Sequence, residues 1–244
     1  MPPRFGRYYE PFAGGAALFF RTAPERAVVS DSNADLIATY RAIARDVRAV
    51  IRRLEQHQRC HSEAHYLATR AAWNANAGDA AERAAMFVYL NKTCFNGLWR
   101  VNRRGENNVG SGKYAKFEPD ADNLTAAAAV LARAELRAGD YQAALFDVRA
   151  GDFVYLDSPY DTTFGSYTVG KFGDAQQAEL AFVVRTLATR GVCVMASNAD
   201  TQRVRALYAG LRIDVVQCAR AINRDGAKRG PVDEVIVTAG YQHP

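Results

Sequence analysis

The chain has 244 residues, of which 49% are hydrophobic and 23% charged, and its formal net charge at pH 7 is +5. This length fits one large domain, or one domain with an insertion, better than two equal domains. The composition is that of an ordinary globular protein and argues against disordered, collagenous and coiled-coil proteins. The basic balance slightly favours a polyanionic partner.

The cysteines and the apolar runs restrict the cellular setting. Cys60, Cys94, Cys193 and Cys218 are scattered without a C-x-x-C pair, so we expect reduced thiols in a cytoplasmic protein. Residues 1–10 carry arginines but lack the apolar segment of a signal peptide. No apolar run approaches the roughly 18–20 residues of a membrane span, so no membrane association is expected.

Hydrophobic periodicity locates the expected secondary structure. Short apolar runs that end in turn residues predict strands at residues 28–31, 153–156, 191–198, 213–216 and 235–238. Helical spacing predicts helices at residues 35–54, 63–90, 124–136, 175–189 and 204–209, with Asp174 as a helix N-cap. Strands and helices alternate at both ends, which indicates an α/β sheet. Residues 55–135 break the alternation and predict a helical insertion, in which residues 91–114 form a loop or hairpin.

The segment EPFAGGA at residues 10–16 predicts a glycine-rich turn between a strand and a helix. Glycine lets the backbone approach a ligand closely, as in nucleotide-binding α/β proteins. The next strand ends at Asp31, whose carboxylate is placed to accept hydrogen bonds from ribose hydroxyls. A purely structural turn is the alternative interpretation of this pair.

A second candidate site is the tetrapeptide at residues 157–160, Asp-Ser-Pro-Tyr, which follows a strand at the edge where open α/β sheets bind ligands. A flat base can stack on Tyr160 while its exocyclic amine donates to the Asp157 carboxylate and to a backbone carbonyl. Two such acceptors favour a tetrahedral nitrogen whose lone pair can attack, and Pro159 would keep the turn rigid. An ordinary strand-ending turn is the alternative.

These segments are part of an ordered series of motifs that covers nearly the whole chain. The motifs are EPFAGGA with ALFF at 10–20, DSNADLI at 31–37, LNK with FNGLWRVN and GENNV at 90–109, DSPY at 157–160, FGSY at 164–167 with Phe172, SNAD at 197–200, and GAKRGPVDE at 226–234. In order and spacing they resemble the Dam-type DNA adenine methyltransferases, which use S-adenosylmethionine and show the chain order called group α.

The resemblance implies an α/β fold, a Rossmann-like class I methyltransferase sheet with an inserted helical and β-hairpin target-recognition subdomain. Residues 1–54 and 136–244 would form the catalytic, S-adenosylmethionine-binding domain, and residues 55–135 the insert. The implied reaction is direct methyl transfer to the exocyclic amine of an adenine flipped out of double-stranded DNA, without a metal. The implied catalytic residues are Asp157, Ser158, Pro159 and Tyr160. The implied cofactor-binding residues are Phe12, Ala13, Gly14, Gly15, Ala16, Asp31, Asp140, Tyr141 and Asp157.

The basic segment also makes chemical sense by itself as a DNA-binding hairpin. Arg100 can form a bidentate pair with guanine in the major groove, worth roughly 1–3 kcal/mol of discrimination. Phe95 could wedge into the base stack, while neighbouring cations, Lys116 among them, would contact phosphates. The implied DNA-binding residues are Phe95, Asn96, Leu98, Arg100, Asn102, Arg103, Arg104, Asn108 and Lys113. A solvated basic surface is the alternative.

Three departures from the family pattern leave alternatives open. Ser158 replaces the usual first proline, so φ is not locked there, and slow or absent catalysis stays possible. Gly110 and Lys113 stand where GATC-reading members have proline and arginine, so a GATC-like target is one option among several. The family's K-W-x-G-G-K segment has no match before Glu10. A start placed too late, a trimmed chain and partial substitution by Arg4 and Arg7 are the alternatives, and weak cofactor binding is predicted for the chain as given. A catalytically impaired DNA-binding homologue and an RNA adenine methyltransferase are the competing hypotheses.

Two further patterns each allow two interpretations. His57, His61 and His65 are spaced i, i+4 and i+8, and on one helix face they could bind zinc or nickel. We expect a solvated helix face and no metal there. A basic stripe is interpreted as solvated, with DNA-backbone contact as the alternative; it consists of Arg41, Arg45, Arg48, Arg52 and Arg53. We expect a monomer in the cytoplasm, encoded by a bacterium or a phage.

Overall fold

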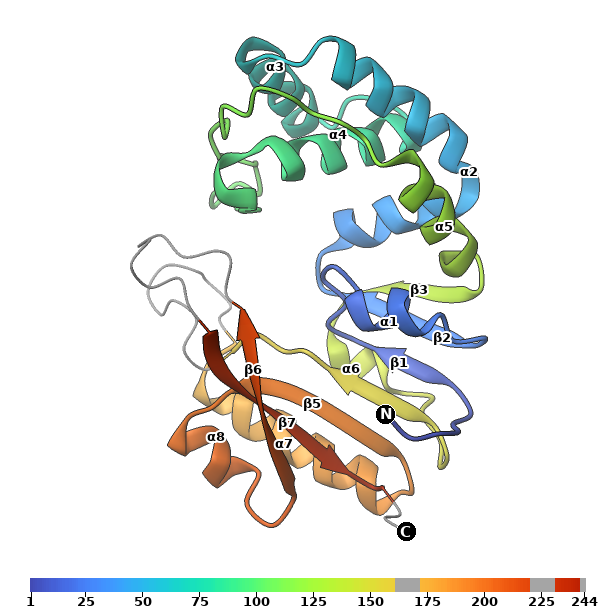
Figure 1. The fold of residues 1–244 in the computed structure, drawn as a ribbon, viewed down its shortest axis with the longest axis vertical. Helices are drawn as coiled ribbons and strands as arrows, with labels where there is room; N and C mark the ends of the chain where they lie inside the picture. Colours follow the sequence, from blue (N-terminus) through green and yellow to red (C-terminus); the bar gives the residue numbers. More distant parts are fainter. Residues whose placement is uncertain (161–171, 220–230, 242–244) are drawn as a thin grey trace. The chain divides into compact units, whose positions relative to one another are not determined.

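The computed structural model describes residues 1–160, 172–219 and 231–241 (Figure 1). The chain divides into two compact units: unit 1 is Met1–Ser32 with Gly139–Pro244, and unit 2 is Asn33–Ala138. The sequence placed the first boundary at residue 54, inside the long helix α2 (Ala34–Arg59). Because α2 packs along α4 (Ala80–Thr93) and α5 (Ala121–Leu131), the whole helix belongs to the compact unit 2. The division into a catalytic and a recognition part remains a functional prediction.

Unit 1 is built on a twisted sheet with a mostly parallel centre. Its strands are β1 (Tyr8–Glu10), β2 (Ala27–Asp31), β4 (Phe153–Leu156), β5 (Cys193–Ala199), β6 (Arg212–Ala219) and β7 (Pro231–Ala239). They are ordered β2-β1-β4-β5-β7-β6; β2, β1, β4 and β5 run parallel, and β7 is antiparallel to both neighbours. The strands expected from the sequence are thereby confirmed, with shifted ends.

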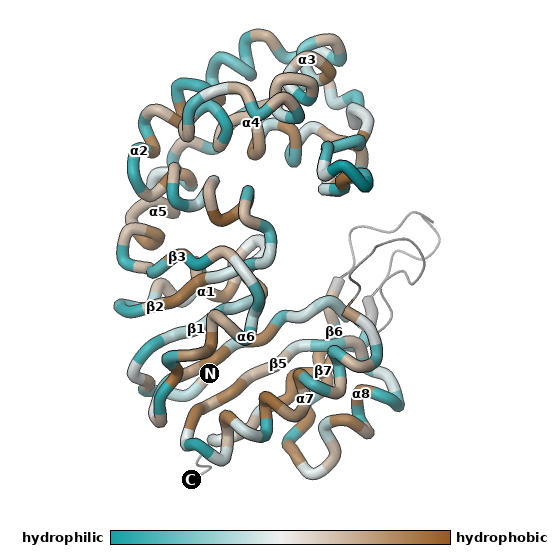
Figure 2. The backbone as a smooth tube through the Cα atoms, turned by 180° about the vertical axis from the view of Figure 1, so that it is seen from behind, coloured by the Kyte–Doolittle hydropathy of each residue, from teal (hydrophilic) through white to brown (hydrophobic). Residues whose placement is uncertain are grey.

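The two faces of this sheet are covered by different helices. Tyr8 and Tyr9 alternate across the sheet, as neighbours on a strand must. Tyr8 packs near Phe19 of α1 (Ala17–Thr22), with ring centroids 6.3 Å apart. Tyr9 belongs to the core formed with α6 (Tyr141–Ala144), α7 (Asp174–Thr189) and α8 (Gln202–Leu207). Figure 2 shows the hydrophobic stretches of β5 and α7 that contribute to this core.

The beginning of α7 corrects one expectation. The N-cap of α7 is Gly173 rather than Asp174, which is already the first helical residue. The Gly173 N–H donates to the Gln176 side-chain oxygen at 3.0 Å, so a glutamine reaching back from the first turn satisfies the helix end. The carboxylate of Asp174 still lies in the first turn, where negative charge is favourable.

Unit 2 is mainly helical and contains, besides α2, α4 and α5, the helix α3 (Glu63–Asn74), the short 3-10 turn η1 (Phe95–Gly97) and the strand β3 (Ala134–Ala138). Its helices begin at side-chain caps, for example Asp79, which accepts from the Glu82 N–H at 2.9 Å. The helix expected at 124–136 ends at Leu131, and β3 follows. Residues 134–138 are mostly good helix formers, so local propensity misses a strand set by tertiary structure.

The three spaced histidines do not share a helix face, because the chain turns between α2 and α3. His57 lies on α2 and His65 on α3, and their ring nitrogens Nδ1 and Nε2 are 2.9 Å apart. His61 lies between the helices and bonds to the Tyr89 hydroxyl at 2.9 Å. Burial, and then the neighbouring His65, lower the pKa of His57 to about 4. The expectation of a solvated helix face was therefore wrong.

The described residues contain neither a metal-binding cluster nor a helix suited to a membrane. Among them, no group of three or more His, Cys, Asp or Glu side chains is arranged to hold a metal ion. None of the described helices is long and apolar enough to cross a membrane.

Candidate active site and nucleic-acid interface

A cavity of about 580 Å³ opens in unit 1 at the carboxyl ends of β1, β2 and β4, where open α/β sheets bind their ligands. Its volume lies in the range typical of small-molecule sites. The sequence singled out four of the lining residues as site residues: Phe12, Asp140, Tyr141 and Pro159. Three more, Pro11, Ser32 and Phe172, lie in the quoted motifs, whereas Gly139, Gln142, Gln176 and Glu179 were not predicted.

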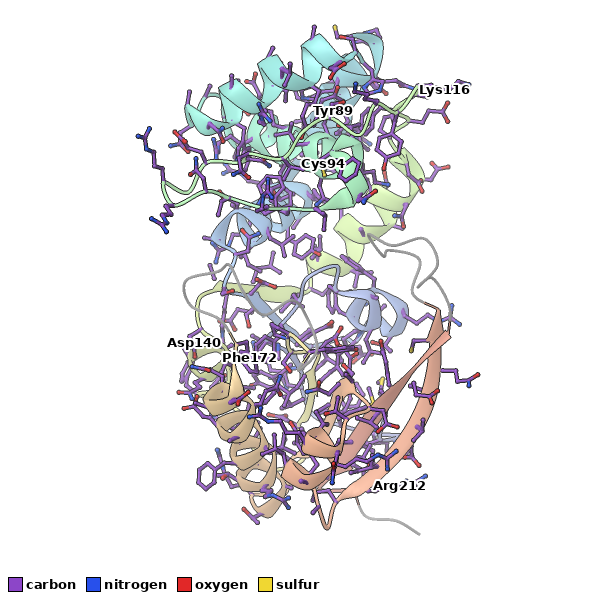
Figure 3. All side chains as sticks on the ribbon, turned by 90° about the vertical axis from the view of Figure 1, so that its left-hand side faces the viewer. Tyr89, Cys94, Lys116, Asp140, Phe172 and Arg212 are labelled. Carbon is purple, nitrogen blue, oxygen red and sulfur yellow. The ribbon has the colours of Figure 1, made fainter. Side chains whose placement is uncertain are left out.

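Three aromatic rings form one wall of the cavity. The rings of Phe12 and Tyr141 are stacked, with centroids 5.0 Å apart and planes inclined by 27°. The Phe172 ring meets Phe12 edge-on at 5.6 Å. Figure 3 shows Phe172 close to Asp140, whose carboxylate caps α6 by accepting from the Gln142 N–H at 2.8 Å. Flat apolar surface beside a carboxylate suits a heteroaromatic ring that carries an amine.

The glycine-rich turn follows β1 and is tied to the end of β2. Gly14 has φ of 45°, in the left-handed region where glycine is favoured, and its N–H donates to Asp31 Oδ2 at 2.9 Å. Ala16 adopts the same region with φ of 48° and precedes α1. A Cβ added at Gly14 or Gly15 would meet nothing within 4 Å, so the turn borders open space. The predicted turn and Asp31 are therefore brought together.

Glu10 is a charged group buried at the start of this turn, with 2% of its surface exposed. Its Oε2 accepts from the Tyr8 hydroxyl at 2.6 Å and from the Phe19 N–H at 3.1 Å. Burial raises the pKa of Glu10 to about 7; these two hydrogen bonds act in the opposite direction, and the negative charge of Asp157 adds to the rise. Glu10 thus ties β1 to the first turn of α1 beneath the glycine-rich segment.

The tetrapeptide 157–160 leaves β4 beside β5. The parallel register pairs Leu156 with Ala196, so Asp157 emerges next to Ser197. The Ser197 hydroxyl donates to Asp157 Oδ1 at 2.5 Å. Because that proton is committed to a carboxylate, Tyr155 must be the donor in its 3.3 Å contact with Ser197 Oγ. Asp157 itself is exposed, so its carboxylate is oriented by the sheet yet reachable from solvent.

The remaining three residues of the tetrapeptide are held to different degrees. The Tyr160 hydroxyl donates to Glu234 Oε2 of β7 at 3.1 Å, and burial raises the pKa of Tyr160. The Pro159 carbonyl accepts from the Gln177 side chain at 2.8 Å. Ser158 is buried, and among the described residues its hydroxyl has no hydrogen-bond partner.

The segment after α4 in unit 2 folds back on itself as a hairpin. Antiparallel bridges join Cys94 to Ser111 and Val101 to Asn107. The part of the hairpin near its tip is held against α3, since Asn74 of α3 and Asn107 exchange two hydrogen bonds, of 2.8 and 3.0 Å. The loop or hairpin expected for residues 91–114 is thus confirmed. Figure 3 labels Cys94 at its base and Lys116 beyond its end.

The hairpin exposes the residue types expected of a nucleic-acid surface. Phe95 is 56% and Leu98 51% exposed, although both are large apolar side chains. Trp99, in contrast, packs on Phe87 at 4.4 Å and serves the core of unit 2. The predicted DNA-contacting residues Arg103, Arg104, Asn108 and Lys113 are exposed, and Asn96 and Asn102 are half-buried.

Asn108 orients the predicted base-reading arginine. Its Oδ1 accepts from Arg100 Nε at 2.9 Å, and neither terminal nitrogen of Arg100 is hydrogen-bonded to a described residue. Asn102 stabilises the hairpin tip instead, because its Oδ1 accepts from the N–H groups of Arg104 and Glu106. The guanidinium of Arg100 therefore keeps both donors of a bidentate pair.

Some expected motif residues lie outside the described residues. These are the FGSY segment at 164–167 and residues 226–230 of the terminal basic loop. The basic stripe on α2 is described; its Arg41 donates to the Leu136 carbonyl at 2.6 Å, and its Arg53 lies 4.0 Å from Asp79.

The sheet and its ligand edge define the class of protein. A parallel sheet whose last pair of strands includes the antiparallel β7, with a cavity at the carboxyl ends of β1, β2 and β4, is the class I methyltransferase fold predicted from the sequence. A family model of D12 class N6 adenine-specific DNA methyltransferases matches residues 1–222. The chain belongs to this family.

Curated relatives agree with this placement. The type II methyltransferase M1.LlaDCHI of Lactococcus lactis subsp. cremoris is 34% identical over 249 residues, which cover 98% of this chain and 88% of that protein. The type II methyltransferase M.MjaIII of Methanocaldococcus jannaschii is 35% identical over 246 residues, covering 91% and 84%. A DNA adenine methylase of Vibrio cholerae is 34% identical over 242 residues, covering 96% and 87%.

The buried carboxyl of Glu10 generates a prediction about stability. Because its pKa of about 7 in the folded protein exceeds the ordinary 4.5, the native state binds more protons between these pH values, and Glu10's contribution to stability is lost as pH rises through 7. The free energy of unfolding of Glu10→Gln minus that of wild type should therefore increase by about 3 kcal/mol as the pH rises from about 4 to about 8. Urea unfolding across this range measures the difference. Glu25→Gln, at an exposed carboxyl, is the control. A difference in unfolding free energy between Glu10→Gln and wild type that does not change with pH would contradict the prediction.

Proposed function

We propose that this chain transfers a methyl group from S-adenosylmethionine to the exocyclic amine of adenine in a short sequence of double-stranded DNA. The observation that carries the proposal is the Asp157 carboxylate, oriented by Ser197 at the end of β4 and followed by a residue, Pro159, that lines the cavity. Family membership supplies the reaction class, and this geometry supplies a site for it.

The cavity fits the methyl donor in size and chemistry. The rings of Phe12, Tyr141 and Phe172 offer flat surface for an adenine, and Asp140 offers an acceptor for its amine. Asp31 stands at the end of β2 as the predicted ribose partner. The open space beside Gly14 and Gly15 is room that a ligand can fill. When bound, S-adenosylmethionine supplies an electrophilic methyl group on a sulfonium.

The residues of the tetrapeptide act on the target base. Asp157 and the Ser158 carbonyl accept hydrogen bonds from the adenine amine, which favours a tetrahedral nitrogen with an available lone pair. Tyr160 stacks on the extruded base, and Glu234 holds its hydroxyl. Most of the rate enhancement in this scheme comes from positioning, because reactants held in the correct geometry avoid the entropy loss of a bimolecular encounter.

The hairpin of unit 2 supplies recognition of the DNA. Arg100 reads a guanine edge, Phe95 enters the base stack, and exposed cations such as Arg103 contact phosphates. A GATC-like sequence is compatible with this set. We place the protein in the cytoplasm of a bacterial cell as a monomer, where its substrate is accessible.

Removal of the Asp157 carboxylate tests the site. Asp157→Ala should lower transfer of a radiolabelled methyl group to unmethylated duplex DNA by about 10²–10⁴-fold, because the amine loses the acceptor that prepares its lone pair. DNA affinity, measured by fluorescence anisotropy, should stay within about threefold, since the phosphate and base contacts lie on the hairpin.

Asp214→Ala, which removes an exposed carboxylate paired with Arg212 on β6, is the control and should keep full activity. Undiminished transfer by Asp157→Ala would contradict the assigned role. A wild-type chain that binds DNA without any transfer would instead identify a catalytically impaired DNA-binding homologue.

Two arginines of the hairpin should differ in their effect on specificity. Arg100→Ala should relax the preference for guanine at one position of the target by roughly 1–3 kcal/mol, because a bidentate pair with its O6 and N7 is lost. Arg103→Ala should weaken binding to all sequences alike and lower the salt dependence. Methylation of a panel of single-substitution duplexes measures both. Equal losses on all duplexes for Arg100→Ala would show that it contacts only the backbone.

A further inference from the structure

A chain of buried side-chain amides connects β5 to the catalytic tetrapeptide. The Ala199 N–H donates to Asn198 Oδ1 at 2.8 Å, and the Asn198 amide nitrogen donates to Gln177 Oε1 at 3.0 Å. The Gln177 amide nitrogen in turn donates to the Pro159 carbonyl at 2.8 Å. Gln177 is 1% and Asn198 2% exposed, so water does not compete for these bonds.

The donor and acceptor roles in this series of hydrogen bonds follow from chemistry alone. A backbone N–H can only donate, so Asn198 must turn its oxygen to Ala199 and its nitrogen to Gln177. Gln177 must then present its oxygen to Asn198 and its nitrogen to the Pro159 carbonyl, which can only accept. Flipping either amide would set two donors or two acceptors face to face in a buried site, and such a mismatch is expensive.

The last hydrogen bond of this series, from Gln177 to the Pro159 carbonyl, fixes the backbone at the catalytic turn. The Pro159 carbonyl belongs to the peptide plane that leads into Tyr160, so holding the oxygen fixes ψ of Pro159. The proline ring already fixes φ of the same residue. Gln177 lies in the first turns of α7, which packs along β5 (Figure 1), so the anchor is part of the rigid core. Pro159 is thus constrained from both sides, and the direction in which Tyr160 leaves the turn is set.

Ser158 is the less constrained neighbour in the same turn. Its φ is not locked by a ring, and its buried hydroxyl has no partner among the described residues. The following proline restricts its backbone towards extended conformations. An external anchor on the next carbonyl therefore matters more with serine at position 158 than it would with proline there.

We propose that Gln177 is a positioning residue for methyl transfer, which holds the Pro159 carbonyl so that the turn 157–160 presents the Ser158 carbonyl and the Tyr160 ring in a fixed geometry. This inference rests on the proposed function and adds a residue that does not line the cavity. It also assigns the anchor a specific task, which is to stabilise a turn that contains serine at its second position.

Gln177→Met tests the proposal, because it removes the amide donor at nearly constant volume. We expect kcat for methyl transfer to fall about tenfold or more, while KM for DNA and for S-adenosylmethionine stays within about twofold. Val184→Ala, a core substitution on the same helix, is the control for lost stability and should leave kcat within about twofold at temperatures well below its Tm. Equal losses of kcat in both variants would overturn the proposal.

Adding Ser158→Pro provides a rescue that a purely structural role would not produce. Ser158→Pro should raise the kcat of Gln177→Met by a certain factor. That factor should be at least three times the factor by which Ser158→Pro changes the kcat of the wild-type enzyme. The same factor in both backgrounds would contradict the coupling. If Gln177→Met does not fold, Gln177→Leu also removes the donor to the Pro159 carbonyl, and the same outcomes apply.

Hydrogen exchange of the peptide containing residues 157–160 supplies a reading independent of catalysis. Without DNA or cofactor, exchange should be at least about tenfold faster in Gln177→Met than in wild type, and unchanged in Val184→Ala. If hydrogen exchange is unchanged in Gln177→Met, the claim that Gln177 holds the turn is wrong, even if the wild type is active. A wild type without methyl transfer would overturn the proposed function, whereas the exchange result would still decide whether Gln177 holds the turn.

Discussion

The hydrogen bond from Ser197 to Asp157 joins the ends of two adjacent parallel strands, and the rest of the proposed chemistry depends on it. A carboxylate that must accept from a substrate amine needs a fixed direction as well as access to solvent. The register of β4 and β5 supplies the direction, because it sets the serine directly beside the first residue after β4. The turn that follows can then face the cavity at the same edge of the sheet.

Beneath this edge the protein buries several polar groups, each of which would be destabilising without a partner. Glu10 is satisfied by Tyr8 and Phe19, and the amides of Gln177 and Asn198 satisfy one another. Ser158 and Ser30 of β2 are exceptions, since their buried hydroxyls have no hydrogen-bond partner among the described residues. Polar networks of this kind specify one arrangement of the loops above them, which an apolar core would not do.

The sequence predicted the elements whose signal is local. The apolar runs of β4 and β5, the long amphipathic α2 and the glycine turn after Glu10 were all recognisable from spacing and composition. The strand β3 was missed because its residues favour a helix, and the histidines were misplaced because the turn before Ser62 was not recognised. The partners of Glu10 and Gln177 depend on long-range packing, and no local pattern in the chain indicates them. The roles of the predicted site residues remain proposals.

Sequencing that detects modified bases can show whether the chain methylates adenine in a defined DNA sequence. The wild-type chain would be expressed in a bacterial host that lacks adenine methylation, and the chromosomal DNA would be read for N6-methyladenine. The proposed activity predicts modified adenines at most copies of one short sequence and almost none elsewhere. Unmodified DNA from cells that contain folded wild-type protein would contradict it.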